Sequence, residues 1–99
     1  MNGELTWYEP RPDTLYSLEV ITDLTGASRR SILIYCRQGF IQPILLPPFG
    51  VMAFDERAIR TIREIERLRA EFDINLAGIR IIYSLLDEIR RLHRELAGL

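Results

Sequence analysis

The chain has 99 residues, a size typical of one small domain, and a formal net charge of −1. This near-neutral charge excludes a general electrostatic attraction to nucleic acid, and the single cysteine, Cys36, excludes an internal disulfide. No apolar run is long enough for a membrane span, and the first 13 residues lack the features of a signal peptide. The expected location is therefore the cytoplasm.

Residues 1–15 form the first segment, which we interpret as an N-terminal arm or edge strand. Apolar and polar residues alternate over Gly3–Tyr8, which permits a short strand, and Pro10 and Pro12 then interrupt the pattern.

Two short helices joined by a turn are predicted next. Ser17 can cap a helix over Leu18–Thr25, and Gly26 ends it in a turn. Ser28 can cap a second helix over Arg29–Gln38. The apolar residues assigned to the inner faces are Leu18, Ile21 and Leu24 in the first helix and Ile32, Leu33 and Tyr35 in the second. This arrangement predicts a helix–turn–helix.

The stretch after Gly39 predicts a β-hairpin, or wing. Its three prolines prevent a helix, whereas Ile44–Leu46 and Val51–Phe54 favour extended chain and Gly50 offers the turn. Residues 16–54 are thus expected to form a helix–turn–helix plus wing.

Two longer helices are predicted over residues 55–99. Asp55 can cap Glu56–Phe72, and Asn75 can cap a final helix, Leu76–Leu96, about 30 Å long at 1.5 Å per residue. The buried stripe of the earlier helix is expected to contain Ile59, Ile62, Ile65, Leu68 and Phe72. The whole chain is interpreted as a single domain, mostly α-helical.

The final helix carries two adjacent apolar rows on its surface. The first row contains Ile79, Ile82, Leu86, Ile89 and His93, and the second contains Ile81, Leu85, Leu92 and Leu96. Two rows exceed what one neighbouring helix needs, so they favour a second helix from the same or another chain. The prediction is a homodimer whose interface includes Ile82, Leu85, Ile89, Leu92 and Leu96. The alternative, of about equal weight, is that both rows are internal core.

Arginines at the second short helix are the candidate DNA contacts. Arg29 and Arg30 open that helix where a DNA reader meets bases and phosphates, and Arg37 could reach the backbone. However, the wing residues Ile44–Met52 include no basic side chain, although phosphate neutralisation dominates DNA affinity. We therefore favour pairing of Arg29 and Arg30 with surface acids.

No group of residues predicts catalysis, a cofactor or a metal site. His93 is the only histidine, and nearby acids do not match its helical face. Cys36 is expected to be half-buried, and neither a catalytic triad nor a phosphate-binding glycine loop is present. The acidic pair Asp87 and Glu88 is expected to bind Arg90 and Arg91 or, alternatively, a basic partner surface. Binding rather than enzymatic activity is predicted.

The segment YSLEVITDLTGASRRSILIYCRQGFIQP, Tyr16–Pro43, resembles the first part of MerR-type winged helix–turn–helix domains. The matching positions are Leu24-Thr25-Gly26, Ser28, Tyr35, Gly39 and Pro43. The departures are Leu33, Ile34 and Cys36 around the tyrosine, and Met52 and Ala53 where the wing usually carries an arginine before its aromatic residue. The resemblance therefore implies the fold more strongly than DNA binding.

Glu66–Leu92 is similar to the chaperone-modulator (CbpM) family. The shared features are Arg67-Leu68-Arg69, Gly78 and the Leu85–Ile89 run. This resemblance implies a protein that binds the J-domain of a DnaJ-like co-chaperone and restrains its stimulation of Hsp70. The expected docking groups, complementary to a basic J-domain helix, are Asp87 and Glu88, with Glu64, Glu66 and Glu71 as alternatives. The rival hypothesis is a MerR-like, dimeric DNA-binding regulator that uses Arg29, Arg30 and Arg37.

Overall fold

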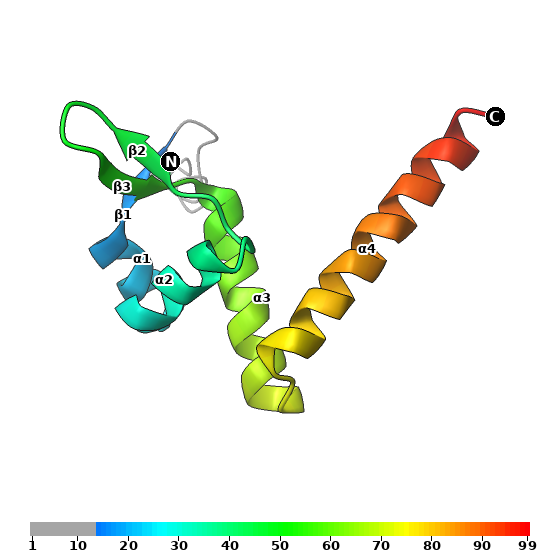
Figure 1. Cartoon of the computed structure of the whole chain (residues 1–99), viewed down its shortest axis with the longest axis horizontal. Helices are drawn as coiled ribbons and strands as arrows, with labels where there is room; N and C mark the ends of the chain where they lie inside the picture. Colours follow the sequence, from blue (N-terminus) through cyan, green and yellow to red (C-terminus); the bar gives the residue numbers. More distant parts are fainter. Residues whose placement is uncertain (1–13) are drawn as a thin grey trace, which may run out of the picture. The chain divides into compact units, whose positions relative to one another are not determined.

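The computed structural model describes residues 14–99, and the strand expected at Gly3–Tyr8 lies outside these residues. Its elements are β1 (Tyr16–Ser17), α1 (Leu18–Thr25), α2 (Arg29–Arg37), β2 (Ile44–Leu46), β3 (Val51–Phe54), α3 (Glu56–Phe72) and α4 (Leu76–Ala97) (Figure 1). The mostly helical architecture with a small β-wing and a long last helix is confirmed. The chain divides into two compact units, one ending at Glu64 and the other comprising Ile65–Leu99. The single-domain assignment stays a prediction.

Each of the four expected helix caps forms. Ser17 Oγ accepts a hydrogen bond from the Val20 N–H at 3.2 Å, and Ser28 Oγ accepts one from the Ser31 N–H at 3.0 Å. The carboxylate of Asp55 accepts from the Ala58 N–H at 3.2 Å, and Asn75 Oδ1 accepts from the Gly78 N–H at 2.9 Å. These bonds satisfy backbone N–H groups that the start of a helix leaves unpaired. Because each cap depends only on residues close in sequence, the predicted helix starts agree with those in the structure.

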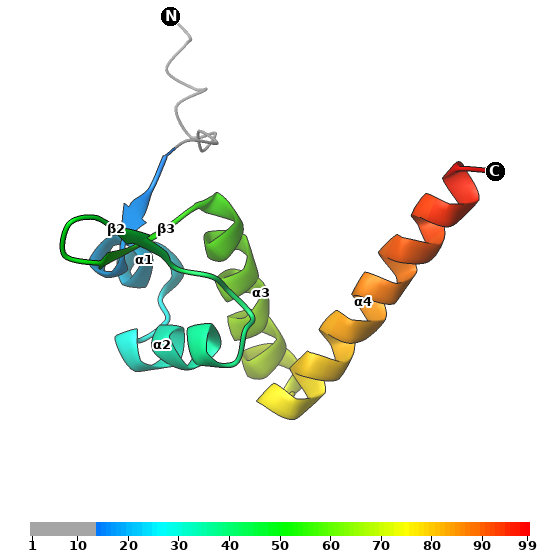
Figure 2. The same cartoon turned by 45° about the horizontal axis from the view of Figure 1, so that its top comes forward.

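The sheet has three antiparallel strands in the order β1-β3-β2, one more than the predicted hairpin. Ile44 pairs with Ala53 and Leu46 with Val51, while Tyr16 pairs with Phe54 on the other edge of β3. Figure 2 shows the loop through which the chain turns back from β2 to β3. The sequence did not indicate β1 because a two-residue strand contains no measurable alternation. Gly50, at φ 70°, supports the turn between β2 and β3 in a conformation that glycine adopts without strain.

The core of the first unit is formed by α1, α2, the sheet and the start of α3. Its buried side chains include Leu18, Ile21, Ile32, Tyr35, Ile41, Phe54, Ile59 and Ile62. The prediction that Leu24 faces inward is wrong, because 43% of this residue is exposed. The short helix already buries Leu18 and Ile21, and it ends at Thr25, so its last turn lies at the rim of the core.

The second unit consists of the last part of α3, a short turn and α4. Ile65 and Ile79 are fully buried and Leu68 is half-buried, as the predicted stripe requires, but the inward assignment of Phe72 is wrong because 57% of it is exposed. Phe72 is the last residue of α3, and Asp73 then turns the chain at φ 53°. The helix therefore ends before a neighbouring element can cover this ring.

Candidate functional site

The outer face of α2 carries a hollow with arginines at its edge. The hollow has a volume of about 530 Å³, and its lining within the described residues is Arg29, Arg30, Leu33, Ile34 and Arg37. These residues share one side of the helix because they recur at intervals of three and four. The three arginines are exposed and the two aliphatic residues are half-buried.

Among residues 14–99, only one of these arginines forms an ion pair. Arg29 Nη1 lies 3.4 Å from Glu19 Oε2, and both side chains are well exposed. Arg30 and Arg37 have no ion-pair partner among residues 14–99. The expected neutralisation by surface acids is therefore seen for Arg29 and not for Arg30 within that part of the chain.

The wing exposes apolar rather than basic side chains. Leu45 is 62% exposed, Val51 58% and Phe49, near the hairpin tip, 88%. No charged residue occurs between Pro43 and Phe54. A hairpin of this composition cannot neutralise phosphates, but its exposed apolar area suits contact with another protein.

A mixed acidic and apolar face on α1 was not predicted from sequence. Glu19, Val20, Asp23 and Leu24 are exposed, and their spacing places them on adjoining positions of one helix side. α1 contains no basic residue, and Asp23 has no ion-pair partner within the described 14–99 range. The signal that could have identified this face is the pair of acids four residues apart, each followed by an aliphatic residue.

The two apolar rows of α4 differ in exposure. In the first row Ile79 is buried and Ile82 and Leu86 are half-buried. The second row and Ile89 are open to solvent: Ile81, Leu85, Ile89, Leu92 and Leu96 are between 43% and 65% exposed. We call these five residues the α4 strip. Of the five expected interface residues, four belong to the strip, whereas Ile82 lies on the more buried side.

The acids predicted to dock a partner lie on helices α3 and α4. Asp87 binds Arg90 at 3.2 Å, and Glu88 binds Arg91, which also binds Glu95. The hydrogen bond that Arg91 donates to the Glu88 carboxylate is the main cause of the raised pKa of Arg91. The pairing expected from helical spacing is thus present, and it partly neutralises the acidic pair.

The three alternative acids occupy α3. Glu71 binds Arg67 at 3.2 Å and is exposed, as is Glu64, whereas Glu66 is half-exposed. None of these five acids lines either of the two cavities described within residues 14–99.

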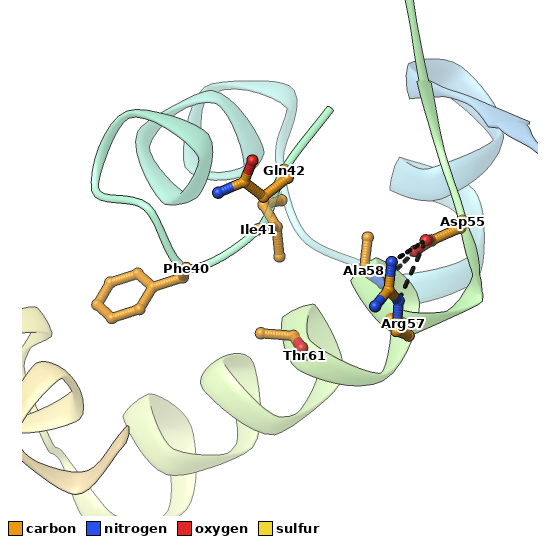
Figure 3. Close-up of a pocket in the computed structure, with 7 residues that line it drawn as sticks. All are labelled: Phe40, Ile41, Gln42, Asp55, Arg57, Ala58 and Thr61. Carbon is orange, nitrogen blue, oxygen red and sulfur yellow. Dashed lines mark hydrogen bonds and ion pairs between the residues drawn. The ribbon is translucent and has the colours of Figure 1, made fainter. Parts of the chain in front are cut away.

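A small pocket of about 220 Å³ lies between the segment after α2 and the start of α3 (Figure 3). Its lining residues are Phe40, Ile41, Gln42, Asp55, Arg57, Ala58 and Thr61. Arg57 bends back to donate two hydrogen bonds to Asp55 Oδ2, at 3.1 and 3.3 Å (Figure 3). Partial burial acts to raise the pKa of Asp55, but the bonds from Arg57 and the Ala58 N–H outweigh it and lower the pKa. This carboxylate is a satisfied helix cap rather than a free catalytic acid.

The remaining chemical candidates are also accounted for by local structure. Cys36 is half-buried as expected, and burial raises the pKa of its thiol, so it is a poor nucleophile. No group of three or more histidine, cysteine or carboxylate side chains is arranged to hold a metal ion in residues 14–99. Over the same residues, no helix has the length and hydropathy needed to cross a membrane.

Comparison with known proteins agrees with this geometry. The model of the family described as "MerR HTH family regulatory protein" matches residues 16–99. A protein of Streptomyces coelicolor, described as "Putative heat shock protein HspR", is 30% identical over 93 residues. The match covers 93% of this chain and 61% of that protein, so the chain spans about three fifths of the relative's length.

Proposed function

Since this chain belongs to the MerR HTH regulatory protein family, we propose that it acts as a chaperone modulator, binding the J-domain of a DnaJ-like co-chaperone and restraining its stimulation of Hsp70. The observation that carries the proposal is the wing. A hairpin that exposes Leu45, Phe49 and Val51 and carries no charge lacks the basic side chains with which a DNA-reading wing neutralises phosphates. Exposed aromatic and aliphatic residues are instead the usual anchors of protein interfaces.

Two further observations support a role beside chaperones. The resemblance to the CbpM family rests on Arg67-Leu68-Arg69, Gly78 and Leu85–Ile89. The structure explains why glycine occupies position 78: a Cβ there would lie only 2.8 Å from Ile74 Cγ2. In addition, the Streptomyces coelicolor relative is described as a putative heat shock protein.

Charge complementarity indicates where a basic J-domain helix would dock. Asp87 and Glu88 can bind a basic helix only if their ion pairs with Arg90 and Arg91 break. On α1, Asp23 has no ion-pair partner among residues 14–99 and Glu19 has one, Arg29. Both acids lie beside exposed aliphatic residues. We propose that the J-domain contacts α1 and that Asp87 and Glu88 add a weaker contribution. While the J-domain is held there, Hsp70 cannot reach it, so inhibition is by occlusion.

We further propose that the α4 strip joins two copies of the chain. Its members recur at intervals of three, four and seven residues over four turns, the spacing by which two helices interdigitate. In a two-fold dimer the same strip serves both chains, so the apolar surface of each is covered by the other.

Calorimetric titration with the cognate J-domain tests the proposed function. We expect saturable binding, and inhibition of J-domain-stimulated Hsp70 ATPase over the same concentration range. Asp23→Asn should weaken the affinity about fivefold, the loss of roughly 1 kcal/mol for one exposed charge pair. Asp87→Asn should have a smaller effect.

Asp73→Asn is the matched control, because it also removes one negative charge from an exposed aspartate. Asparagine tolerates the backbone φ of 53° at this position, so the substitution should not strain the turn. This variant should bind like the unaltered protein. Absence of J-domain binding at micromolar concentrations would refute the proposed function. Equal effects of Asp23→Asn and Asp73→Asn would instead remove α1 from the interface.

Sequence-specific DNA binding is the second candidate function. It is favoured by the exposed positions of Arg29, Arg30 and Arg37 on one face of α2, the helix that enters the major groove in helix–turn–helix proteins. It requires a palindromic site and a steep fall in affinity with salt. A gel-shift assay can compare binding of the protein to its gene's own upstream region with binding to random duplex DNA. Selective binding of the upstream region supports this function, and equal binding of both DNAs contradicts it.

A further inference from the structure

The last turn of α1, which carries Asp23 and Leu24, has little packing of its own. α1 has only eight residues, and its two buried side chains, Leu18 and Ile21, both lie in its first half. A helix this short is marginal alone in water, so it depends on tertiary contacts. Asp23 also weakens the turn, because a negative charge near the C-terminus of a helix is unfavourable. The order of this turn therefore depends on bonds from other parts of the chain.

Arg63 of α3 provides such a bond. Its Nη2 donates at 3.0 Å to the carbonyl oxygen of Leu24, one of the groups that the end of a helix leaves without an intrahelical donor. The bond is charge-assisted, and it brings positive charge to a helix whose last turn has no basic residue. The backbone that carries Arg63 is held in place, because the adjacent Ile62 is fully buried.

We propose that Arg63 is a positioning residue for the partner face of α1. Through the Leu24 carbonyl group it holds the last turn of α1, so that Asp23 and Leu24 are presented in one fixed geometry to a basic amphipathic helix of the partner. A face that is ordered before binding loses less conformational entropy on binding, and the complex is stronger. The proposal rests on the proposed function, in which the J-domain contacts α1, and it gives Arg63 no contact with the partner.

The charge of Arg63 makes the sign of its effect decisive. If Arg63 acted only as a positive charge near the partner, its removal would favour a basic helix, because like charges at an interface oppose binding. Loss of positioning has the opposite effect. Arg63→Ala should therefore weaken J-domain binding about fivefold, the equivalent of one net hydrogen bond. Tighter binding by this variant would overturn the proposal.

Calorimetric titration with the J-domain compares this variant with two others, each shown by circular dichroism to be folded. Arg63→Lys keeps the charge and a donor, so it should restore most of the affinity. Arg60→Ala is the matched control, because Arg60 lies three residues earlier in α3 and pairs with Glu56 of the same helix at 2.7 Å. It should bind like the unaltered protein. Equal losses in Arg60→Ala and Arg63→Ala would contradict a specific role for Arg63.

A double-mutant cycle tests whether Arg63 acts through Asp23. Asp23→Asn removes the charge that the ordered turn presents to the partner. Adding Arg63→Ala to this variant should therefore weaken binding less than Arg63→Ala does in the unaltered protein. Additive losses would show that Arg63 does not position Asp23, and the proposal would fail.

Amide hydrogen exchange in the protein without its partner tests the hold on the turn directly. The Gly26 N–H, which donates to the Thr22 carbonyl oxygen at 2.9 Å, reports on the last turn of α1. Its exchange should become about fivefold faster in Arg63→Ala and stay unchanged in Arg60→Ala. Unchanged exchange in Arg63→Ala would overturn the proposal. Faster exchange in a protein that does not bind the J-domain would instead overturn the proposed function alone, so the two failures are distinguishable.

Discussion

Replacing Leu85 by glutamate should dissociate the proposed dimer. Leu85 is 59% exposed and lies in the middle of the α4 strip, so a partner helix would cover it. Full burial of a leucine contributes about 1.5–3 kcal/mol, so covering the exposed part contributes roughly 1–2 kcal/mol. Because a two-fold interface contains the residue twice, loss of both copies costs about 2–4 kcal/mol, and burying a carboxylate adds to this. The dimer Kd should therefore rise at least about 100-fold.

Multi-angle light scattering and sedimentation over a concentration series measure this change. Ser84→Glu is the control, because it introduces the same charge one residue away, outside the α4 strip, and should leave the dimer intact. Circular dichroism confirms that both variants keep their helices. A monomer mass for the unaltered protein at high concentration would refute the reasoning, and so would equal dissociation by both substitutions.

Three further predictions concern local structure. Asp55→Ala should lower the free energy of unfolding by about 1 kcal/mol through loss of the α3 cap, whereas Asp55→Asn, which can still cap, should lose less. Because the pKa of Asp55 is depressed in the folded state, its charge stabilises the protein above the unfolded pKa of about 3.9, and this stabilisation is lost as the pH falls through the folded value. Gly78→Ala should destabilise by about 1 kcal/mol, although alanine normally favours helix, because its Cβ would clash with Ile74 Cγ2. Cys36 should react with thiol reagents more slowly than a free cysteine, since its pKa is raised by burial.

Each of these outcomes has its own control. Chemical denaturation of the alanine and asparagine variants between pH 3 and 7 separates capping from charge; identical profiles for Asp55→Asn and the unaltered protein would contradict the pKa argument. Gly78→Ala in an Ile74→Leu background should be neutral or stabilising, because leucine has no Cγ2 methyl group. Persistent destabilisation there would show that the clash is not the cause. For Cys36, full reactivity should return in denaturant, and a fast reaction in the native protein would contradict the assignment.

The sequence by itself determined the local structure of this protein. Ser17, Ser28, Asp55 and Asn75 began their helices as expected because a cap depends on hydrogen bonds within three residues along the chain. Helical periodicity separated the two rows of α4, and composition showed that the wing is uncharged. These properties depend on neighbours in sequence, so reading the chain was sufficient to find them.

Only the tertiary structure decided which apolar surfaces are covered. Periodicity identifies an apolar face but not its neighbour, so it assigned Leu24 and Phe72 to the core although both are exposed. Periodicity could not show β1, because its two residues become a strand only by pairing with β3. It also could not show the 3.0 Å hydrogen bond that Arg63 Nη2 donates to the carbonyl oxygen of Leu24, a residue 39 positions earlier in the sequence. The acidic face of α1 became a candidate site for the same physical reason: solvent exposure is decided by contacts between segments that are distant in the sequence.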